Sequence, residues 1–239
     1  MLQMTQVTKI YRTELVETHA LRALDLQVNE GEFVAVTGPS GSGKTTFLNI
    51  AGLLEEFSGG EYRLDGQDVR GLSDDARSRL RNQKIGFIFQ SFNLIPDLNL
   101  FDNVDVPLRY RGMSAAERKD RIEKALSDVG LGSRTKHYPA ELSGGQQQRA
   151  AIARALAGSP RLLLADEPTG NLDSQMARGI MELLEEINAT GTTIVMVTHD
   201  PELAARAQRN VHIVDGIATD ISQVSPLARV SASLPEARV

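Results

Sequence analysis

The segment that most constrains the fold lies near the N-terminus, where a short apolar run enters a glycine-rich turn. Residues 30–38 read EGEFVAVTG, residues 38–45 read GPSGSGKT, and residues 45–54 read TTFLNIAGLL. The first run is typical of a buried strand, and the apolar spacing of the last is typical of a buried helix. A strand, a glycine loop and a helix in this order predict an α/β domain with a phosphate-binding turn.

This turn matches the phosphate-binding pattern G-x-x-x-x-G-K-[ST]. Its glycines let backbone N–H groups close around phosphate oxygens, Lys44 reaches the β- and γ-phosphates, and the Thr45 hydroxyl suits Mg²⁺. A glycine-rich turn without a ligand is the alternative, and the flanking strand and helix argue against it. The predicted phosphate-binding segment comprises Gly38, Pro39, Ser40, Gly41, Ser42, Gly43, Lys44, Thr45 and Thr46.

Two more short apolar runs, RLLLAD at 161–166 and TTIVMVT at 192–198, have the composition of strands buried in a parallel sheet. Between them, residues 173–189 predict a helix that Asp173 caps and that ends before Gly191. This β-α-β pattern predicts a mostly parallel sheet covered by helices. One face of the predicted helix is apolar and consists of Met176, Ile180, Leu183, Leu184 and Ile187.

Polar side chains follow three of the apolar runs. Asp166 and Glu167 end RLLLADE, His199 follows TTIVMVT, and Gln90 ends IGFIFQ. Beside a phosphate loop, one carboxylate can hold Mg²⁺ while its neighbour orients a water for in-line attack. Each signal is weak alone, because strands often end in acidic residues, a lone histidine is more often structural, and a glutamine can simply end an edge strand.

Residues 91–145 predict a mostly helical insertion. Ser114 and Glu117 are spaced as a capping box, and Gly130 is placed to end the helix that follows. Apolar residues recur between them at helical spacing, namely Ile122, Ala125, Leu126 and Val129. From Thr219 the chain loses clear periodicity, so we expect residues 219–239 to form a loosely packed or disordered tail.

Composition narrows the functional classes. The net charge of −5 disfavours a nucleic-acid binder, which usually needs a basic face to neutralise phosphates. The absence of cysteine excludes disulfides and thiolate metal sites. The first residues, MLQMTQVTKIYRTEL, lack the apolar core of a signal peptide, and no apolar run approaches the ~20 residues that span a bilayer. In a membrane assembly, we therefore expect another chain to supply the spans.

A second glycine-containing segment, LSGGQQQRAAIARALAG at 142–158, starts another predicted helix with a serine and two glycines. Helix starts of this kind bind anions, so the chain carries two predicted phosphate sites. All these motifs, in this order, resemble the ATP-binding cassette of ABC proteins, over about residues 2–218. The most specific element is the signature LSGGQ at 142–146.

This resemblance implies a role for each motif. The implied parts are the Walker A loop at 38–45, the Q-loop glutamine Gln90, Walker B with Asp166, the catalytic glutamate Glu167, the D-loop at 171–174, the switch histidine His199, and Tyr11 stacked on adenine. ATP and Mg²⁺ are the implied cofactors, with Thr45, Gln90 and Asp166 as metal ligands and with Glu167, His199 and Lys44 as catalytic residues. The segment Ser143, Gly144, Gly145 and Gln146 would meet a nucleotide held by a second subunit, which implies a head-to-tail homodimer around two ATP molecules.

Finer patterns indicate a subfamily. GFIFQSFNLIPDLNLFDNVDVPLRYRG, YPAELSGGQQQR and DEPTGNLDS are most similar to the macrolide-export, lipoprotein-release and cell-division ATPases MacB, LolD and FtsE. The similarity implies a peripheral subunit at the cytoplasmic face of the bacterial inner membrane. Its partners would be an integral permease of the MacB, LolC or FtsX type and periplasmic components reached through that permease. A candidate docking groove within residues 88–110 consists of Phe92, Leu94, Ile95, Pro96 and Leu98, and core packing of the same side chains is the alternative.

The implied architecture is an α/β, ABC-type P-loop NTPase with a mostly parallel sheet, an N-terminal antiparallel β part and a helical subdomain. One nucleotide-binding domain would span 1–218, with 1–90 and 146–218 as the core and 91–145 as the helical subdomain.

Three other functions stay open. An importer ATPase would more usually show TSALD where this chain has TGNLD, and 239 residues with one motif set fit poorly with ABC ATPases that act on nucleic acid or ribosomes. A phosphate-loop kinase or GTPase would leave LSGGQ unexplained, and the sequence has no N-K-x-D motif.

Overall fold

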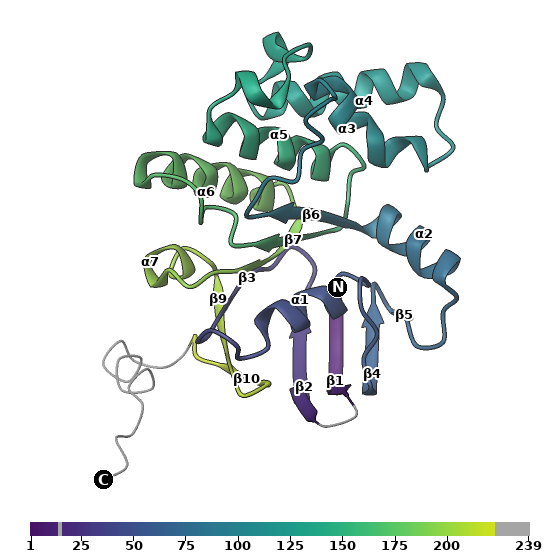
Figure 1. The fold of residues 1–239 in the computed structure, drawn as a ribbon, viewed down its shortest axis with the longest axis vertical. Coiled ribbons are helices and arrows are strands. Elements are labelled where there is room, and N and C mark those ends of the chain that lie inside the picture. The colour runs from purple at the N-terminus through teal and green to yellow at the C-terminus, as the bar shows by residue number, and fades with distance from the viewer. Residues whose placement is uncertain (14–15, 223–239) are drawn as a thin grey trace.

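Two sheets organise the protein, whose computed structural model describes residues 1–13 and 16–222 (Figure 1). The larger, six-stranded sheet has the order β10-β9-β3-β8-β7-β6, from β3 (Phe33–Thr37), β6 (Ile85–Phe89), β7 (Leu162–Asp166), β8 (Thr193–Val197), β9 (Arg209–Val214) and β10 (Ile217–Asp220). All its pairs are parallel except β9 with β10. The smaller sheet is antiparallel, in the order β2-β1-β4-β5, from β1 (Leu2–Arg12), β2 (Glu17–Val28), β4 (Gly59–Leu64) and β5 (Gln67–Asp68). The predicted fold class, including its N-terminal antiparallel part, is confirmed.

Side chains of the central strands alternate between two hydrophobic cores. Along β3, Phe33 and Ala35 belong to one core, and Val34 and Val36 belong to the other. Strands β7 and β8 alternate in the same way. Successive side chains of a strand point to opposite faces, so both faces of this sheet are covered. That is why the sequence shows unbroken apolar runs here rather than a polar alternation.

Helices cover the two faces of the large sheet differently. One core lies beneath a helical layer, which Figure 1 shows at the top, formed by α3 (Leu100–Arg109), α4 (Ala115–Asp128), α5 (Gly144–Leu156) and α6 (Ser174–Ala189). Smaller elements on this side are α7 (Pro201–Ala204) and the 3-10 helices η1 (Gly132–Arg134) and η2 (Pro139–Glu141). The other core lies between the large sheet, α1 (Lys44–Ala51), α2 (Asp74–Lys84) and the antiparallel sheet. The protein therefore has three layers, with the large sheet in the middle.

Side-chain caps set the starts of the helices. The Asp173 carboxylate accepts hydrogen bonds from the Gln175 and Met176 N–H groups, so α6 starts and ends where the sequence predicts. Ser114 caps α4 by accepting from the Glu117 N–H at 3.2 Å. Met176 differs from the other residues predicted on the apolar face of α6, because it is 37% exposed and belongs to neither core. It lies in the first turn, where its side chain packs over Gly145 of α5 instead of over the sheet.

Two predicted boundaries fall inside continuous elements. The boundary between residues 145 and 146 lies within α5, which packs against both the helical layer and β6. The boundary at 218 lies within β10, which continues to Asp220 because the strand pairs with β9. Beyond it, the Ile221 N–H donates to Asn210 O at 2.9 Å. The rest of the predicted tail, 223–239, lies outside the described residues.

A buried hydroxyl links the antiparallel sheet to α1. Tyr62 on β4 is fully buried, and its hydroxyl donates to Ala51 O at the end of α1 at 2.7 Å. Burial raises the pKa of this phenol. We expect Tyr62→Phe to lower the free energy of unfolding by about 1–2 kcal/mol, because Ala51 O loses its partner inside the core. Chemical denaturation measures this, and Tyr110→Phe, at an exposed position, serves as the control.

Candidate functional site

Four neighbouring parallel strands bring the predicted catalytic residues to one edge of the large sheet. The phosphate loop follows β3, His199 follows β8, Asp166 ends β7 and Gln90 follows β6. The order β3-β8-β7-β6 makes these strands direct neighbours, and parallel strands end on the same side. Residues that lie more than 100 positions apart in the sequence therefore meet, as expected at the carboxyl edge of an open α/β sheet.

The phosphate loop has a backbone that only glycine tolerates at two positions. Gly38 and Gly43 have φ values of 146° and 103°. A Cβ atom would lie 2.1 Å from Ile213 O at Gly38 and 2.4 Å from Ala20 O at Gly43. Because Gly43 caps α1 without a side-chain hydrogen bond, the N–H groups at the helix start have no side-chain partner in the cap. Such N–H groups form an anion site with the helix dipole behind it.

The Lys44 side chain folds back over the phosphate loop. Its Nζ donates to Gly38 O at 2.8 Å and to Pro39 O at 2.7 Å. Burial lowers the pKa of Lys44, while Glu167 and Asp166 act to raise it. Nearby, the Ser42 hydroxyl is buried and has no hydrogen-bond partner among the described residues. The loop thus presents one cation and one orphaned hydroxyl beside two carboxylates.

Asp166 and Glu167 are adjacent carboxylates in a partly desolvated position. Burial raises the pKa of Asp166, the Glu167 charge raises it further, and Lys44 opposes both effects. Glu167 has a φ of 44°, a left-handed conformation that is strained for a non-glycine residue. Its N–H donates to Val197 O at 2.9 Å, which ties the turn after β7 to β8.

His199 contacts the strained glutamate. Its Nδ1 lies 3.0 Å from the Glu167 carboxylate, although the imidazole is otherwise largely exposed. A histidine that uses Nδ1 in this way keeps its Nε2 free for another partner. The arrangement can therefore orient a carboxylate towards a water and present an imidazole nitrogen beside it.

Gln90 lies next to the β7 turn, but its side chain turns to the D-loop. Phe89 pairs with Asp166 across β6 and β7, which places the following Gln90 beside Glu167. The Asn171 amide nitrogen donates to Gln90 O at 3.0 Å, and the Gln90 amide lies 3.5 Å from Asn171 Oδ1. Mg²⁺ usually keeps several waters and phosphate oxygens as ligands, so one or two protein ligands suffice to hold it. Among the described residues, no group of three or more His, Asp or Glu side chains forms a metal cage.

Tyr11 lies beside the start of α1. Its hydroxyl donates to Glu55 at 2.8 Å, and the Lys9 ammonium lies 4.9 Å from its ring centroid. Burial and Glu55 raise the pKa of Tyr11, while the Thr46 side chain lowers it, so the ring is close to the end of the phosphate loop. Tyr11 is 40% exposed, which leaves surface for a planar ligand.

The signature segment lies elsewhere, in the helical layer. Ser143 caps α5 and forms a reciprocal capping box with Gln146. Gly144 packs near Leu172, and a Cβ on Gly145 would lie 2.9 Å from the Met176 sulfur. Within the described residues, no hydrogen bond or ion pair joins 143–146 to the phosphate loop at 38–46. The structure thus brings together all the predicted site residues except this segment.

Sequence reasoning missed two polar side chains that support the site, Gln148 and Arg154, both on α5. It placed Asn171 in the D-loop but gave no contact between Asn171 and Gln90. Gln148 shares the buried face of α5 with Ala151 and Ile152. The sequence signal for Gln148 was a glutamine at a position of the helix where the periodicity favours an apolar residue. Arg154 donates to Phe92 O at 2.8 Å and also to Asn93 O. No local sequence pattern predicts this contact, because it joins segments about 60 residues apart.

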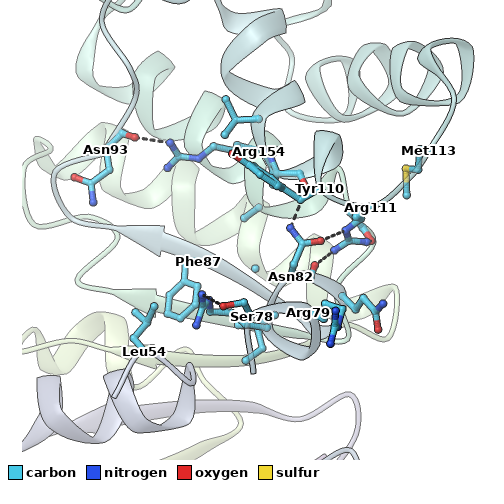
Figure 2. A pocket seen from close by; sticks show the side chains of 18 of the residues that line it. Leu54, Ser78, Arg79, Asn82, Phe87, Asn93, Tyr110, Arg111, Met113 and Arg154 are labelled. Atoms are coloured by element: carbon cyan, nitrogen blue, oxygen red, sulfur yellow. Dashed lines mark hydrogen bonds between the residues drawn. The ribbon is translucent and has the colours of Figure 1, made fainter. Parts of the chain in front are cut away.

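A cleft of about 1080 Å³ lies between α2, β6 and the helical layer (Figure 2). Phe87 and Phe89 stack along β6, and exposed Leu54 and Tyr110 add apolar surface. The charged residues that line it are Arg79, Arg81, Arg111, Arg154 and Asp75. None of the five residues predicted for a docking groove lines this cleft. Leu94 packs against the helical core instead, and Ile95 is exposed.

Two of these arginines are desolvated without a carboxylate partner in the described part of the chain. Arg111 donates to Asn82 Oδ1 at 2.8 Å and to the carbonyls of Asn82 and Gly158, and Arg154 donates only to Phe92 O and Asn93 O. Burial lowers the pKa of both guanidinium groups, with Arg121 contributing at Arg111. Figure 2 shows both side chains on the wall of the cleft.

Comparison with known proteins decides the family, because the ABC transporter profile matches residues 21–170. The chain belongs to the ABC transporter family. It is 47% identical to the ABC transporter ATP-binding protein YknY of Bacillus subtilis, with 90% of this chain and 94% of YknY covered. It is 44% identical to the macrolide export ATP-binding/permease protein MacB of Marinobacter nauticus, over 99% of this chain but only 36% of that protein.

The fold agrees with a solved ABC cassette. A dimeric, post-hydrolysis structure of the cassette MJ0796 with ADP and Pi has a TM-score of 0.84 and 43% identity, covering 92% of this chain and 99% of that one. The chain is therefore an ABC-type ATPase of the kind found in exporter-type transporters. In the described part of the chain, no helix combines the length and apolar character that a bilayer span requires.

The raised pKa of Asp166 predicts a stabilising substitution. A carboxyl whose folded pKa is raised contributes stability below its unfolded pKa and loses it as pH rises through the folded pKa. At pH 7, ionised Asp166 therefore opposes folding, and Asp166→Asn should raise the Tm of the protein without nucleotide or Mg²⁺. The difference should shrink as pH falls towards about 4, the usual range of Asp. Thermal scans across pH measure it, with the exposed Asp97→Asn as the control; equal shifts for both variants would contradict the assignment.

Proposed function

We propose that this chain is the ATP-hydrolysing subunit of a bacterial ABC transporter that drives a separate permease of the macrolide-export or lipoprotein-release type. The observation that carries the proposal is the Glu167–His199 contact at 3.0 Å beside the phosphate loop, with the signature segment held apart in the helical layer. Coverage of 94% of YknY, named as an ATP-binding protein, supports a separate ATPase subunit. Similarity to MacB, and to a pyoverdine export protein at 46% identity, supports export, although the chain spans only about a third of each.

ATP binding uses the loop and Tyr11. The phosphates lie against the N–H groups of 38–46, and Lys44 exchanges the carbonyls of Gly38 and Pro39 for phosphate oxygens. This exchange favours the charged ammonium, whose pKa burial lowers. The exposed ring of Tyr11 stacks on the adenine.

Mg²⁺ fits the donor set at the strand ends. Thr45 supplies a hydroxyl, Asp166 a carboxylate and Gln90 an amide oxygen, which are hard ligands of the type that Mg²⁺ prefers. When bound, the ion neutralises charge on the transferred phosphoryl group. Asp166, whose pKa is raised by burial and by Glu167, would ionise more favourably beside such a cation.

Hydrolysis follows from the Glu167–His199 pair. Glu167 accepts a hydrogen bond from the attacking water and polarises it for in-line attack on the γ-phosphate. His199 holds the carboxylate through Nδ1 and offers Nε2 to the γ-phosphate, where negative charge develops. Lys44 stabilises the same charge from the loop, and the products are ADP and phosphate.

The second subunit completes the site. The N–H groups of Gly144 and Gly145 lie at the start of α5, and Ser143 caps it, so this end of the helix suits a γ-phosphate. Because no hydrogen bond or ion pair in the described residues joins the segment to its own phosphate loop, we propose that it meets the ATP of a second, head-to-tail copy. The binding energy of two shared ATP molecules then holds the dimer closed.

Glu167→Gln tests the catalytic assignment. It should keep ATP binding, lower turnover by about 10²–10⁴-fold because the water is no longer polarised, and trap an ATP-dependent dimer. Steady-state hydrolysis and light scattering after gel filtration measure the two effects. Adding Ser143→Arg should abolish the trapped dimer, since its bulk and charge block the composite site. Parent-rate hydrolysis by Glu167→Gln would remove Glu167 from this role, and a dimer that survives Ser143→Arg would contradict the shared site.

The cleft is the proposed docking site of the permease. Its lining combines stacked aromatic rings with four arginines and a single aspartate, although the whole chain has a net charge of −5. Buried cations without carboxylate partners are costly, and an acidic side chain of a partner relieves that cost. We therefore propose that a cytoplasmic segment of the permease, apolar on one face and acidic on the other, occupies the cleft. Such a peripheral subunit would lie at the cytoplasmic face of the inner membrane.

Site-specific cross-linking tests the cleft directly, because the chain has no cysteine and one substitution gives a unique thiol. A bifunctional reagent on Tyr110→Cys, at the cleft, should link the subunit to one integral membrane protein in native membranes. Arg63→Cys, on the antiparallel sheet, is the control and should not. Mass spectrometry of the linked peptide should identify an acidic cytoplasmic segment. Links to ribosomal or DNA-bound proteins, or equal links from both positions, would contradict the proposal.

A further inference from the structure

One buried polar side chain on the signature helix has no role in the mechanism above. Gln148 on α5 is 0% exposed. Its Nε2 donates to Pro168 O at 2.6 Å and lies 3.4 Å from Phe89 O. Its Oε1 is buried and has no hydrogen-bond partner in the described part of the chain.

The two carbonyls lie beside predicted site residues, one in the turn after β7 and the other at the end of β6. Pro168 directly follows Glu167, within a turn closed by a hydrogen bond from the Gly170 N–H to Glu167 O at 3.0 Å. Phe89 directly precedes Gln90. Gln148 therefore joins the signature helix to the loop of the catalytic glutamate and to the Q-loop.

A second contact joins those two loops to each other. The Asn171 side chain donates to Gln90 O and lies 3.5 Å from the Gln90 amide. Gly170 allows this approach, because a Cβ there would lie 2.5 Å from the Gln90 amide nitrogen. We call the set of Gln148, Gln90 and Asn171 the three-loop junction. It connects three motifs through polar side chains inside one subunit.

Stability alone does not account for a glutamine at the centre of this junction. Its Oε1, unpaired among the described residues, carries a cost of burial that offsets part of what the two Nε2 hydrogen bonds contribute. The position lies among apolar neighbours such as Ala151 and Ile152. What the amide adds is a directed attachment to the carbonyl beside Glu167.

The helix itself provides the mechanical link. Ser143 and Gln148 lie at the cap and in the second turn of one continuous α5, about 7.5 Å apart along the axis at 1.5 Å per residue. The capping box with Gln146 fixes Ser143 to this helix. A shift of the helix start therefore moves the Gln148 amide with it.

We propose that Gln148 is a positioning residue that sets the Glu167 turn according to the position of the signature helix. This inference rests on the proposed head-to-tail dimer, in which the signature of one subunit meets the ATP held by the other. Engagement of that ATP by Ser143 then aligns Glu167 at the first subunit's own ATP. One subunit thereby connects the two ATP sites.

Gln148→Met tests the role, because methionine keeps the volume and removes the amide. Gln147→Met is the matched control, since the Gln147 side chain donates to Leu142 O, at 3.1 Å, next to its own helix start. Gln148→Met should lower kcat about tenfold or more with KM for ATP within about twofold, whereas Gln147→Met should retain the parent kcat. A folded Gln148→Met protein with the parent kcat would overturn the proposal. A fall in kcat and Tm together with a rise in KM would also overturn it, because these changes indicate a general loosening of the protein.

Two further measurements separate positioning from closure. Gln148→Met combined with Glu167→Gln should still form the ATP-trapped dimer, because the amide acts on alignment; loss of that dimer would overturn the proposal. In a double-mutant cycle, Gln148→Met and Asn171→Ala should lower kcat by less than the product of their separate effects, since they belong to one junction. Independent effects would contradict the junction. If the proposed function itself is wrong, the unmodified chain will lack ATP hydrolysis or ATP-dependent dimerisation. That result is distinct from any difference between the variants and the parent protein.

Discussion

The common edge of four parallel strands is the constraint on which the rest of this structure depends. Strands β3, β8, β7 and β6 end side by side, so a phosphate loop, a histidine, two carboxylates and a glutamine meet without any local sequence contact between them. Both faces of these strands are buried in separate cores, and that double burial holds their register. A slip of one residue in β7 would exchange its core faces and move Asp166 away from the phosphate loop.

Around that edge, the protein keeps charges that folding alone does not favour. Asp166 ionises against a raised pKa, and Glu167 adopts a left-handed backbone that a non-glycine residue avoids. In the cleft, Arg111 and Arg154 are desolvated without carboxylate partners among the described residues. In the proposed function, bound Mg²⁺ and ATP would offset the unfavourable charges at the edge of the sheet, and an acidic permease segment would offset those in the cleft.

Helix α5 connects these features because it belongs to both parts of the subunit. Its first turn presents the signature segment, its buried face reaches the Glu167 turn through Gln148, and Arg154 holds the loop after Gln90 beside the cleft. In the proposed head-to-tail dimer, the phosphate loop and the signature segment of one chain therefore belong to two different ATP sites. Sequence patterns predicted this helix and its capping serine, but a boundary drawn at residue 145 divided an element that the structure shows to be continuous.

The sequence by itself determined the strand–loop–helix unit, the α/β class, the cap of α6 and the family resemblance, because each depends on local spacing or on a motif read in order. Only the tertiary structure decided which side chains meet. It packed Met176 against the signature helix, gave a cleft that none of the five predicted groove residues lines, and paired Asn171 with Gln90. The physical reason is that such contacts join residues brought together by sheet order and helix packing, which local periodicity does not encode.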